Sequence, residues 1–237
     1  MAIALKWYPP SWVQIKNRDQ TIYLDPSYLI KYFKDHPTAR EYSNLSDEVD
    51  GLPDDLEKAD LILITHHHKD HVKKVTVDRI SGPETLILAP ERVKDVLGNQ
   101  IKVVAPGDEI DLDTVKITVV PAYNTPQGSS TRKFHKPGDG VGYLLEIEGQ
   151  RIYHAGDTDF IPEMKELGTV DVAFLPIGGT YTMNVEEAAQ ATLKIQPSLV
   201  VPIHHLEVDP QDLAVELRGE GIKVRILKIG ELLMVGE

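Results

Sequence analysis

The chain has 237 residues, of which 41% are hydrophobic and 26% charged, and its formal net charge is -12. This composition is typical of an ordinary water-soluble globular protein. The acidic balance argues against a nucleic-acid partner, because Lys and Arg supply most of the affinity for phosphates. The chain contains no cysteine, which excludes disulfides, thiolate metal ligands and zinc fingers. No apolar run approaches the roughly 18 residues of a membrane span, and the start of the chain lacks the features of a signal peptide. We therefore expect a cytoplasmic protein without membrane contacts.

Short runs rich in β-branched residues recur along the chain and predict strands. Gly107-Asp108 and Glu148-Gly149 are predicted as hairpin turns. In chain order the predicted strands cover Trp12 to Lys16, Thr21 to Leu24, Leu61 to Ile64, Thr85 to Leu88, Ile101 to Val104, Val115 to Val120, Val141 to Ile147, Arg151 to His154, Val170 to Leu175, Leu199 to Val201, Lys223 to Ile226 and Leu232 to Val235.

Three segments have the terminal signals of helices. In one of them, Asn184 can act as the N-cap, Glu187 follows at the capping-box position, and Pro197 ends the run. A glycine closes each of the other two segments. The predicted helices cover Glu91 to Leu97, Asn184 to Lys194 and Pro210 to Leu217.

No linker, charge run or low-complexity segment divides the chain, so we expect residues 1–237 to form one domain. Both halves consist of strands followed by helices, a pattern that fits an α/β sandwich of two sheets with helices outside. Two polar stretches interrupt this pattern. Residues 26–59 are expected to leave the sheet, and residues 121–140 form a loop of a length that ordinarily signals function or mobility.

The densest group of metal-binding side chains directly follows the apolar run Leu61 to Ile64 and reads Thr65-His66-His67-His68-Lys69-Asp70-His71. Side chains at alternate positions after the end of a strand face the same side, so His66 and His68 can converge on one ion. Asp70 and His71 follow half a turn later and can reach a second ion. This segment therefore predicts the centre of a metal site.

The same alternation turns His67 and Lys69 away from the ions, so we expect both to be surface or supporting residues. Three imidazoles and one carboxylate suit Zn, Mn or Fe(II), and these ligand types do not separate the three metals.

At this motif the sequence resembles the metallo-β-lactamase superfamily, whose signature after the first sheet's core strand is H-x-H-x-D-H. The resemblance covers about residues 10–230 and implies a four-layer αββα sandwich of two mixed β-sheets with outer helices. Within this superfamily, the sequence resembles the small-hydrolase branch, which contains the ascorbate-6-phosphate lactonase-like proteins. Three further segments carry it, namely the G-D-T strand Ile152-Tyr153-His154-Ala155-Gly156-Asp157-Thr158, the late strand Pro202-Ile203-His204, and Gly178-Gly179 through Glu186-Glu187-Ala188-Ala189.

The resemblance implies that Asp157 bridges two metal ions and that His204 completes the second site. A carboxylate suits a bridge because its two oxygens can each hold one cation and offset the repulsion between the ions. Only one of the adjacent His204 and His205 can face the site from a strand, and the motif favours His204. His154 lies within the strand before Asp157, so we expect a buried or supporting histidine.

The chain departs from the family at one ligand position. The third histidine of the first site normally ends a short P-A-x-H sequence, but here the corresponding residues are Pro121-Ala122-Tyr123-Asn124. An amide oxygen is a weaker ligand for Zn or Mn than imidazole. Either Asn124 is a weak ligand, or His135 of the same loop takes the position as a ligand or catalytic acid. A third alternative is a mononuclear enzyme that relies mainly on Asp70, His71, Asp157 and His204.

Asp25, which ends a predicted strand ahead of Pro26, matches a D-P found early in the family. It would accept the second N–H of a ligating imidazole and so fix that ring's tautomer, although a simple turn residue before proline is the alternative. Tyr123, Tyr181 and Thr182 are candidates for the lining of a substrate pocket.

These residues favour a metal-dependent hydrolase that uses a metal-bound hydroxide on a small lactone, ester or phosphorylated metabolite. Asp70 or Asp157 would orient the hydroxide and pass its proton to the leaving group. The alternatives are a phosphodiesterase or nuclease of the same fold, and a protein whose degenerate first site binds a metal or ligand without turnover. We expect one or two divalent ions, Zn or Mn before Fe, and a small-molecule substrate, and homo-oligomer formation is left open. The predicted metal ligands are His66, His68, Asp70, His71, His135, Asp157 and His204.

Overall fold

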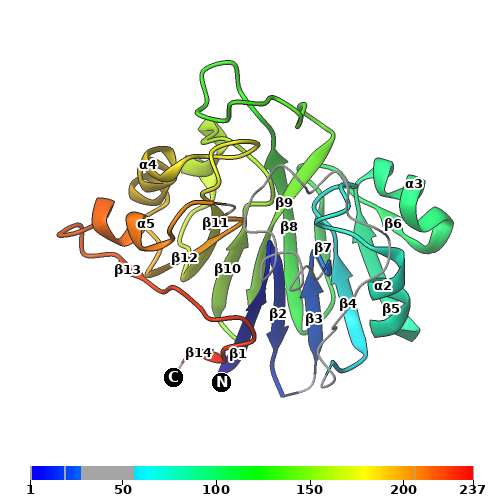
Figure 1. The fold of residues 1–237 in the computed structure, drawn as a ribbon. Helices are drawn as coiled ribbons and strands as arrows, with labels where there is room; N and C mark the ends of the chain where they lie inside the picture. The colour runs from blue at the N-terminus through cyan, green and yellow to red at the C-terminus, as the bar shows by residue number, and fades with distance from the viewer. Residues whose placement is uncertain (1, 19, 28–55, 206, 237) are drawn as a thin grey trace. The chain divides into compact units, whose positions relative to one another are not determined.

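The computed structural model of the chain describes residues 2–18, 20–27, 56–205 and 207–236. The chain divides into two compact units, one formed by Met1–Val104 with Leu227–Glu237 and the other by Ala105–Ile226. Each unit contains one seven-stranded mixed sheet together with short helices (Figure 1). Both units are thus α/β, which confirms the predicted fold class.

The sheet of the first unit has the strand order β14-β1-β2-β3-β4-β5-β6. Neighbours from β14 to β3 are antiparallel and neighbours from β3 to β6 are parallel. The carboxyl ends of parallel strands meet at one edge of a sheet, where α/β proteins build their sites. The strands are β1 (Ile3–Tyr8), β2 (Trp12–Lys16), β3 (Thr21–Leu24), β4 (Ala59–Leu63), β5 (Ser81–Ala89), β6 (Lys102–Val103) and β14 (Leu233–Val235).

One face of this sheet packs against α2 (Lys74–Ile80), η2 (Glu91–Val93) and α3 (Lys94–Leu97), and the 3-10 turn η3 (Gly98–Gln100) follows α3. Trp12, Tyr23 and Ile62 from the strands form a core with Val77 and Leu97 from the helices. Residues on the opposite face of the strands are buried as well, as the fully buried pattern of β3 shows. Burial on both faces explains why these strands read as continuous apolar runs rather than alternating ones.

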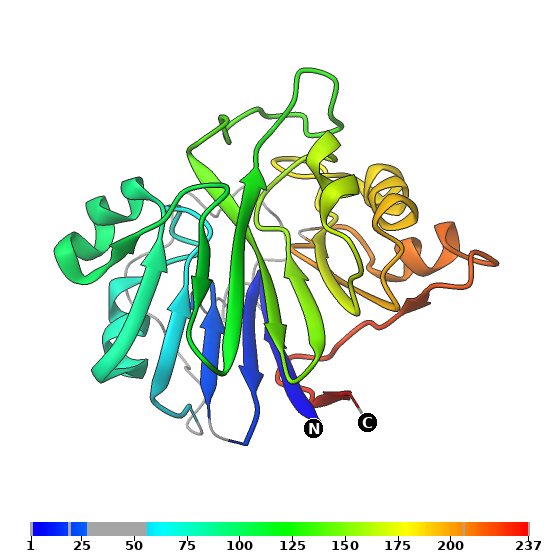
Figure 2. The ribbon, with the colours of Figure 1, turned by 180° about the vertical axis from the view of Figure 1, so that it is seen from behind.

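The sheet of the second unit has the order β13-β12-β11-β10-β9-β8-β7. Neighbours from β7 to β10 are antiparallel and those from β10 to β13 are parallel. The neighbouring strands β8 and β9 are the longest of this sheet, with eight residues each, and Figure 2 shows them side by side. The strands are β7 (Glu109–Asp111), β8 (Val115–Ala122), β9 (Gly140–Ile147), β10 (Gln150–His154), β11 (Val172–Pro176), β12 (Leu199–Ile203) and β13 (Lys223–Val224).

The helical turn η4 (Pro162–Glu166), α4 (Val185–Ile195) and α5 (Gln211–Glu216) complete the second unit. Buried side chains of these elements, among them Met164, Ala188 and Leu213, form one core with strand residues such as Tyr153. Asn184 caps α4 as predicted, because its side chain accepts a 2.9 Å hydrogen bond from the backbone N–H of Glu187. Among the described residues, no helix is long and apolar enough to cross a membrane.

The structure contains a strand in every segment for which the sequence predicts one, with shifted ends, and the hairpin turn at Glu148-Gly149 joins β9 to β10. The loop predicted at 121–140 is confirmed for residues 123–139. Most of the stretch predicted to leave the sheet, residues 28–55, lies outside the described residues.

One prediction about local structure is wrong: Gly107-Asp108 is a turn but not a hairpin, since it connects β6 of one sheet to β7 of the other. The helix predicted at Glu91 to Leu97 is present, with its first three residues in a 3-10 turn. The elements β1, β7, η3, η4 and α2 are not predicted from sequence, and α2 is missed because Val75, Thr76 and Val77 are β-branched residues with low helix propensity.

Candidate metal centre

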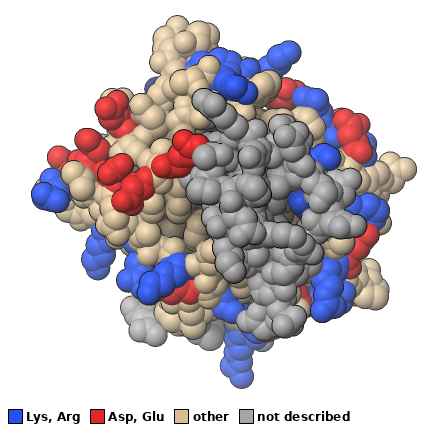
Figure 3. Space-filling view, in the orientation of Figure 1, with Lys and Arg blue, Asp and Glu red and all other residues tan. Residues whose placement is uncertain are grey.

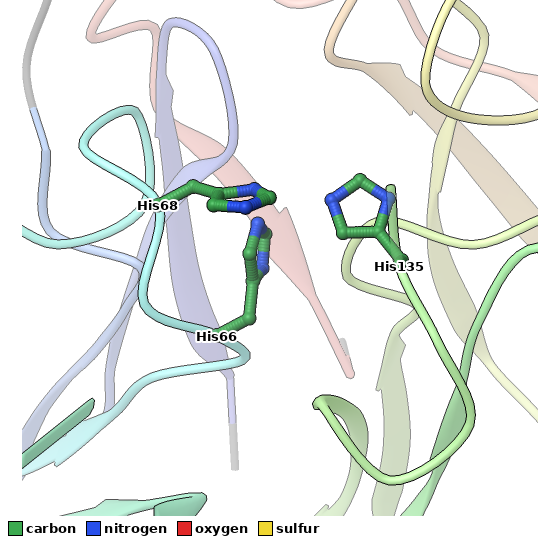
Figure 4. A group of neighbouring side chains, drawn as sticks. All are labelled: His66, His68 and His135. Atoms are coloured by element: carbon green, nitrogen blue, oxygen red, sulfur yellow. The ribbon is translucent and has the colours of Figure 1, made fainter. Parts of the chain in front are cut away.

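The histidine-rich segment leaves the carboxyl end of β4 and folds into a tight turn. The backbone N–H groups of His71 and Val72 both donate to the carbonyl of His68 at 3.0 Å. This turn gathers the imidazoles, because the ring of His66 lies 4.0 Å from that of His71 and 4.6 Å from that of His68, centroid to centroid. Figure 4 shows the rings of His66 and His68 stacked edge to face on this segment.

Asp25 lies at the carboxyl end of β3, directly beside this segment, and is fully buried. Its Oδ1 accepts the backbone N–H of Thr65 at 2.7 Å, and its Oδ2 accepts the Thr65 hydroxyl and Nδ1–H of His71, each at 2.7 Å. The backbone of Asp25 has φ +47°, a left-handed conformation that few non-glycine residues adopt but that aspartate tolerates. The hydrogen bond to an imidazole that the sequence predicts for Asp25 is therefore present.

The same network fixes the tautomers of two rings. Because the single hydroxyl proton of Thr65 goes to Asp25, its oxygen accepts from Nδ1–H of His66, which lies 3.0 Å away. His71 likewise carries its proton on Nδ1, facing Asp25. Both rings therefore present the lone pair of Nε2, the atom that can bind a metal ion.

The remaining residues of the turn differ in exposure. Asp70 is partly exposed, and its Oδ2 lies 4.0 Å from Nε2 of His71. His68 and His67 are half-buried, with ring centroids 4.6 Å apart, and Lys69 is exposed as predicted. The first unit thus brings His66, His68, Asp70 and His71 together.

In the second unit, Asp157 follows the carboxyl end of β10, and His204 follows that of β12, two strands along the sheet. Oδ2 of Asp157 lies 3.5 Å from Nε2 of His204 and 3.4 Å from Nε2 of His135. His135 comes from the loop between β8 and β9 (Figure 4). All three side chains are buried, and the backbone of His204 has φ +48°. The second unit thus brings His135, Asp157 and His204 together.

These separations suit a shared cation better than direct hydrogen bonds. Two ligand atoms that each lie about 2.0–2.1 Å from one tetrahedral ion are about 3.4 Å apart. The measured distances from Asp157 Oδ2 to the two imidazole nitrogens are 3.4 and 3.5 Å. Both imidazoles face the same carboxylate oxygen, whereas the sequence analysis expects one oxygen for each ion. The residues present therefore fit a divalent metal held by nitrogen and oxygen.

Asn124 follows the end of β8 and is buried. Its Nδ2 donates to the carbonyl of Tyr181 at 2.8 Å, and its Oδ1 accepts the backbone N–H of His135 at 2.9 Å. The amide is thus bonded to two neighbouring segments of the same unit.

The other two histidines of the second unit differ from the candidate ligands. His154 is fully buried at the end of β10, as predicted, and its Nδ1 accepts the backbone N–H of Gly156 at 3.2 Å. Nε2 of His205 bonds to the carbonyl of Pro202 at 2.8 Å. Burial lowers the pKa of His205 to about 4, so its ring is neutral at pH 7. A neutral ring bonded through Nε2 to its own backbone is consistent with the preference for His204.

The three candidate pocket residues have structural contacts. The Tyr123 hydroxyl donates to the Glu163 carboxylate at 3.1 Å, and burial, together with this carboxylate, raises the pKa of Tyr123. The ring of Tyr181 packs 5.4 Å from that of Phe134, and Arg132 lies 5.8 Å above it. Thr182 is fully buried. None of these contacts assigns a catalytic role to the three residues.

Asp159, which sequence motifs do not identify, is a fully buried carboxylate that anchors the loop carrying His135. Its Oδ2 accepts the backbone N–H of Thr125 at 2.8 Å and Nζ of Lys133 at 3.0 Å, and its Oδ1 accepts the backbone N–H of Ser130 at 3.2 Å. Its position two residues after Asp157 is the only sequence signal that could have marked it. Glu187 anchors the same loop through the backbone N–H and hydroxyl of Ser129.

Gly128 lies against this anchor, and a Cβ at that position would overlap the Asp159 carboxylate. Because three partners hold the carboxylate in place, we expect Gly128→Ala to lower the free energy of unfolding by about 1–3 kcal/mol, the usual cost of overpacking. Chemical denaturation measures this change. Gly82→Ala is the matched control, since its Cβ would meet only the Thr85 hydroxyl at an ordinary 3.8 Å. Equal stabilities of the two variants would show that the loop is not tightly held.

Buried imidazoles and carboxylates at the carboxyl ends of strands in two mixed sheets are the features of a metal-binding α/β protein. A family model described as the beta-lactamase superfamily domain matches residues 4–204 of the chain. A metal-dependent hydrolase of Pyrococcus furiosus is 38% identical, with 76% of this chain and 84% of that protein covered. One of Anoxybacillus flavithermus is 33% identical, with 96% and 97% covered. The chain therefore belongs to the β-lactamase superfamily, among its metal-dependent hydrolases.

Solved structures agree with this assignment. A crystal structure described as a metal-dependent hydrolase from Parabacteroides distasonis has a TM-score of 0.80 and 32% identity, with 96% of this chain and 93% of that chain covered. A metallo hydrolase from Ignicoccus hospitalis has a TM-score of 0.73 and 26% identity over the full length of both chains. The predicted metallo-β-lactamase fold is thus confirmed.

Proposed function

We propose that the protein hydrolyses a small lactone, ester or phosphorylated metabolite, using one or two divalent metal ions. The candidate ligands are His66, His68, Asp70 and His71 in the first unit and His135, Asp157 and His204 in the second. We expect Zn or Mn, with Fe as the alternative, and the imidazole and carboxylate ligands suit all three metals.

The arrangement of Asp157 between His135 and His204 carries this proposal. A carboxylate oxygen about 3.5 Å from two imidazole nitrogens, with all three residues buried, is costly unless a cation lies among them. Membership of a family of metal-dependent hydrolases supports the same conclusion.

A bound divalent ion supplies an activated water at neutral pH and polarises the scissile bond of the substrate. The chain itself must then hold and move protons. We assign this role to Asp70, because its side chain is 16% exposed, whereas that of Asp157 is only 3% exposed. A partly exposed carboxylate can reach a substrate's leaving group and pass a proton to it. Asp157 is assigned to binding the metal and to orienting the attacking water.

A small substrate is favoured over a nucleic acid by the charge of the chain. The formal net charge is -12, and Figure 3 shows acidic side chains interspersed with the basic ones on the described part of the face that it presents. Phosphate backbones are bound by surfaces on which Lys and Arg gather. A phosphodiesterase or nuclease therefore stays the second choice.

Metal removal tests the proposal. We expect the purified protein to retain Zn or Mn in elemental analysis, and to hydrolyse at least one member of a panel of lactones, carboxylic esters, phosphomonoesters and phosphodiesters. Dialysis against a chelator should abolish turnover, because the chain's own groups do not activate water sufficiently, and adding back Zn or Mn should restore it. Thermal unfolding should shift to higher temperature with the metal, since ligands stabilise the folded state that binds them.

Two results would count against the proposal. Turnover that survives complete metal removal would mean that the hydrolase chemistry does not depend on the ions. Failure to bind either metal at micromolar concentration would leave the buried imidazoles and carboxylates with a purely structural role.

A further inference from the structure

The orientation of the Asn124 side chain is determined by its partners. A backbone N–H can only donate a hydrogen bond and a carbonyl can only accept one. Oδ1 of Asn124 therefore faces the N–H of His135 at 2.9 Å, and Nδ2 faces the carbonyl of Tyr181 at 2.8 Å. The backbone N–H of Asn124 also donates to the carbonyl of His135 at 2.7 Å.

This orientation decides which nitrogen of His135 carries the proton. Nδ1 of His135 lies 3.2 Å from Oδ1 of Asn124 and 3.2 Å from the carbonyl oxygen of Tyr181. Both neighbours are acceptors, so Nδ1 must be the protonated nitrogen. Nε2, which lies 3.4 Å from the Asp157 carboxylate, then presents its lone pair on the side where a cation fits.

We infer that Asn124 is a positioning residue, not a metal ligand, and that it holds His135 as the Nε2 ligand of the first metal. The inference rests on the proposed metal site. It explains the departure at P-A-x-H, because the imidazole comes from a position eleven residues later, and the residue at the usual ligand position supports it. Asp159 and Glu187 anchor the rest of the loop at residues 125, 129, 130 and 133. The side-chain bond to the imidazole ring comes from Asn124.

The first test reads the tautomer of His135 directly in the metal-free protein, by long-range nitrogen–proton NMR, with the signal assigned by its loss in His135→Gln. Wild type and Asn124→Asp should both show the proton on Nδ1, because each keeps an acceptor oxygen beside it. Asn124→Ala leaves the Tyr181 carbonyl as the one remaining acceptor beside Nδ1, so this variant should show a larger share of the tautomer with the proton on Nε2 than wild type does. An unchanged tautomer in Asn124→Ala, or a wild-type proton on Nε2, would overturn the inference.

The second test measures the affinity for Zn by competition with a chromophoric chelator. Loss of a supporting hydrogen bond typically weakens a metal site about 10- to 100-fold, so we expect this loss in Asn124→Ala. His135→Gln should weaken binding at least as much, and Thr131→Ala, an exposed substitution in the same loop, should leave affinity unchanged. If Asn124 were itself a ligand, Asn124→Asp would tighten binding and His135→Gln would not weaken it.

The two tests separate this inference from the proposed function. If wild type bound no Zn, the proposed function would fail, yet the NMR measurement would still show whether Asn124 sets the tautomer. If wild type bound Zn tightly and Asn124→Ala bound it with the same affinity, the metal site would stand and the role of Asn124 would be refuted.

Discussion

Replacing Asp157 with alanine should abolish metal retention and turnover together. The Asp157 carboxylate lies beside both candidate imidazoles of the second unit. Without it, His135 and His204 lose the negative charge that makes the pocket favourable for a divalent cation. A bound metal supplies several kcal/mol of transition-state stabilisation, so its loss should lower kcat/KM by at least about 10³-fold.

Asp157→Asn provides the control for shape, because it keeps the size of the side chain and removes only its charge. Circular dichroism should show both variants folded, and added Zn should raise the unfolding temperature of wild type but not of the variants. Asp212→Ala, in an exposed position of α5, should behave as wild type. Near-normal turnover in Asp157→Ala would exclude this residue from the site and remove the basis of the proposed function.

Replacing Asp25 with alanine should give the largest loss of stability among the substitutions considered. The change leaves the backbone N–H and hydroxyl of Thr65 and Nδ1–H of His71 with no carboxylate in a fully buried site. Breaking one partner of a buried charged network costs about 3–5 kcal/mol, and alanine at φ +47° adds about 1 kcal/mol of strain. Urea unfolding of the metal-free protein measures this loss.

Asp25→Asn tests the role of Asp25 if the alanine variant does not fold. Asparagine tolerates the left-handed backbone and can still accept from Thr65. However, its amide N–H₂ cannot accept from Nδ1–H of His71, so Zn affinity should fall about 10- to 100-fold. Asp60→Asn is the control, since Asp60 accepts the N–H of Thr21 at 2.8 Å in an exposed position away from the histidines. Unchanged Zn affinity in Asp25→Asn would show that His71 needs no support from Asp25.

The positions of the candidate ligands could be predicted where they follow a strand. His66, Asp157 and His204 each lie within three residues of the carboxyl end of a strand, namely β4, β10 and β12. The carboxyl ends of parallel strands meet at one edge of a sheet. That rule brings Asp157 beside His204 without any knowledge of the loops, and it likewise places Asp25 beside Thr65.

The part of the site carried by a loop could not be decided from sequence. Asn124 and His135 were both candidates, because the path of a loop depends on tertiary hydrogen bonds. The bonds that fix this path come from Asp159, which looks like an ordinary turn residue, and from the carbonyl of Tyr181, which has no sequence signature. A sequence motif cannot identify a backbone acceptor, because every residue carries a carbonyl group.

Elements were missed where local propensity and tertiary packing disagree. The helix α2 has no side-chain N-cap bond and contains β-branched residues, yet it forms because Thr76, Val77 and Ile80 are buried against the sheet. The strand β1 was missed even though it pairs with both β2 and β14. The contacts that stabilise α2 come from the sheet, and β1 is stabilised by pairing with the neighbouring β2 and with β14 from the end of the chain.

The most direct measurement of the central claim is a crystal structure of the Zn- or Mn-loaded protein with anomalous scattering from the metal. The proposal predicts anomalous peaks within about 2.0–2.2 Å of Asp157 Oδ2 and of the Nε2 atoms of His135 and His204. It would be contradicted by peaks bound elsewhere on the chain, or by an ion coordinated through Asn124 while His135 remained outside the coordination sphere.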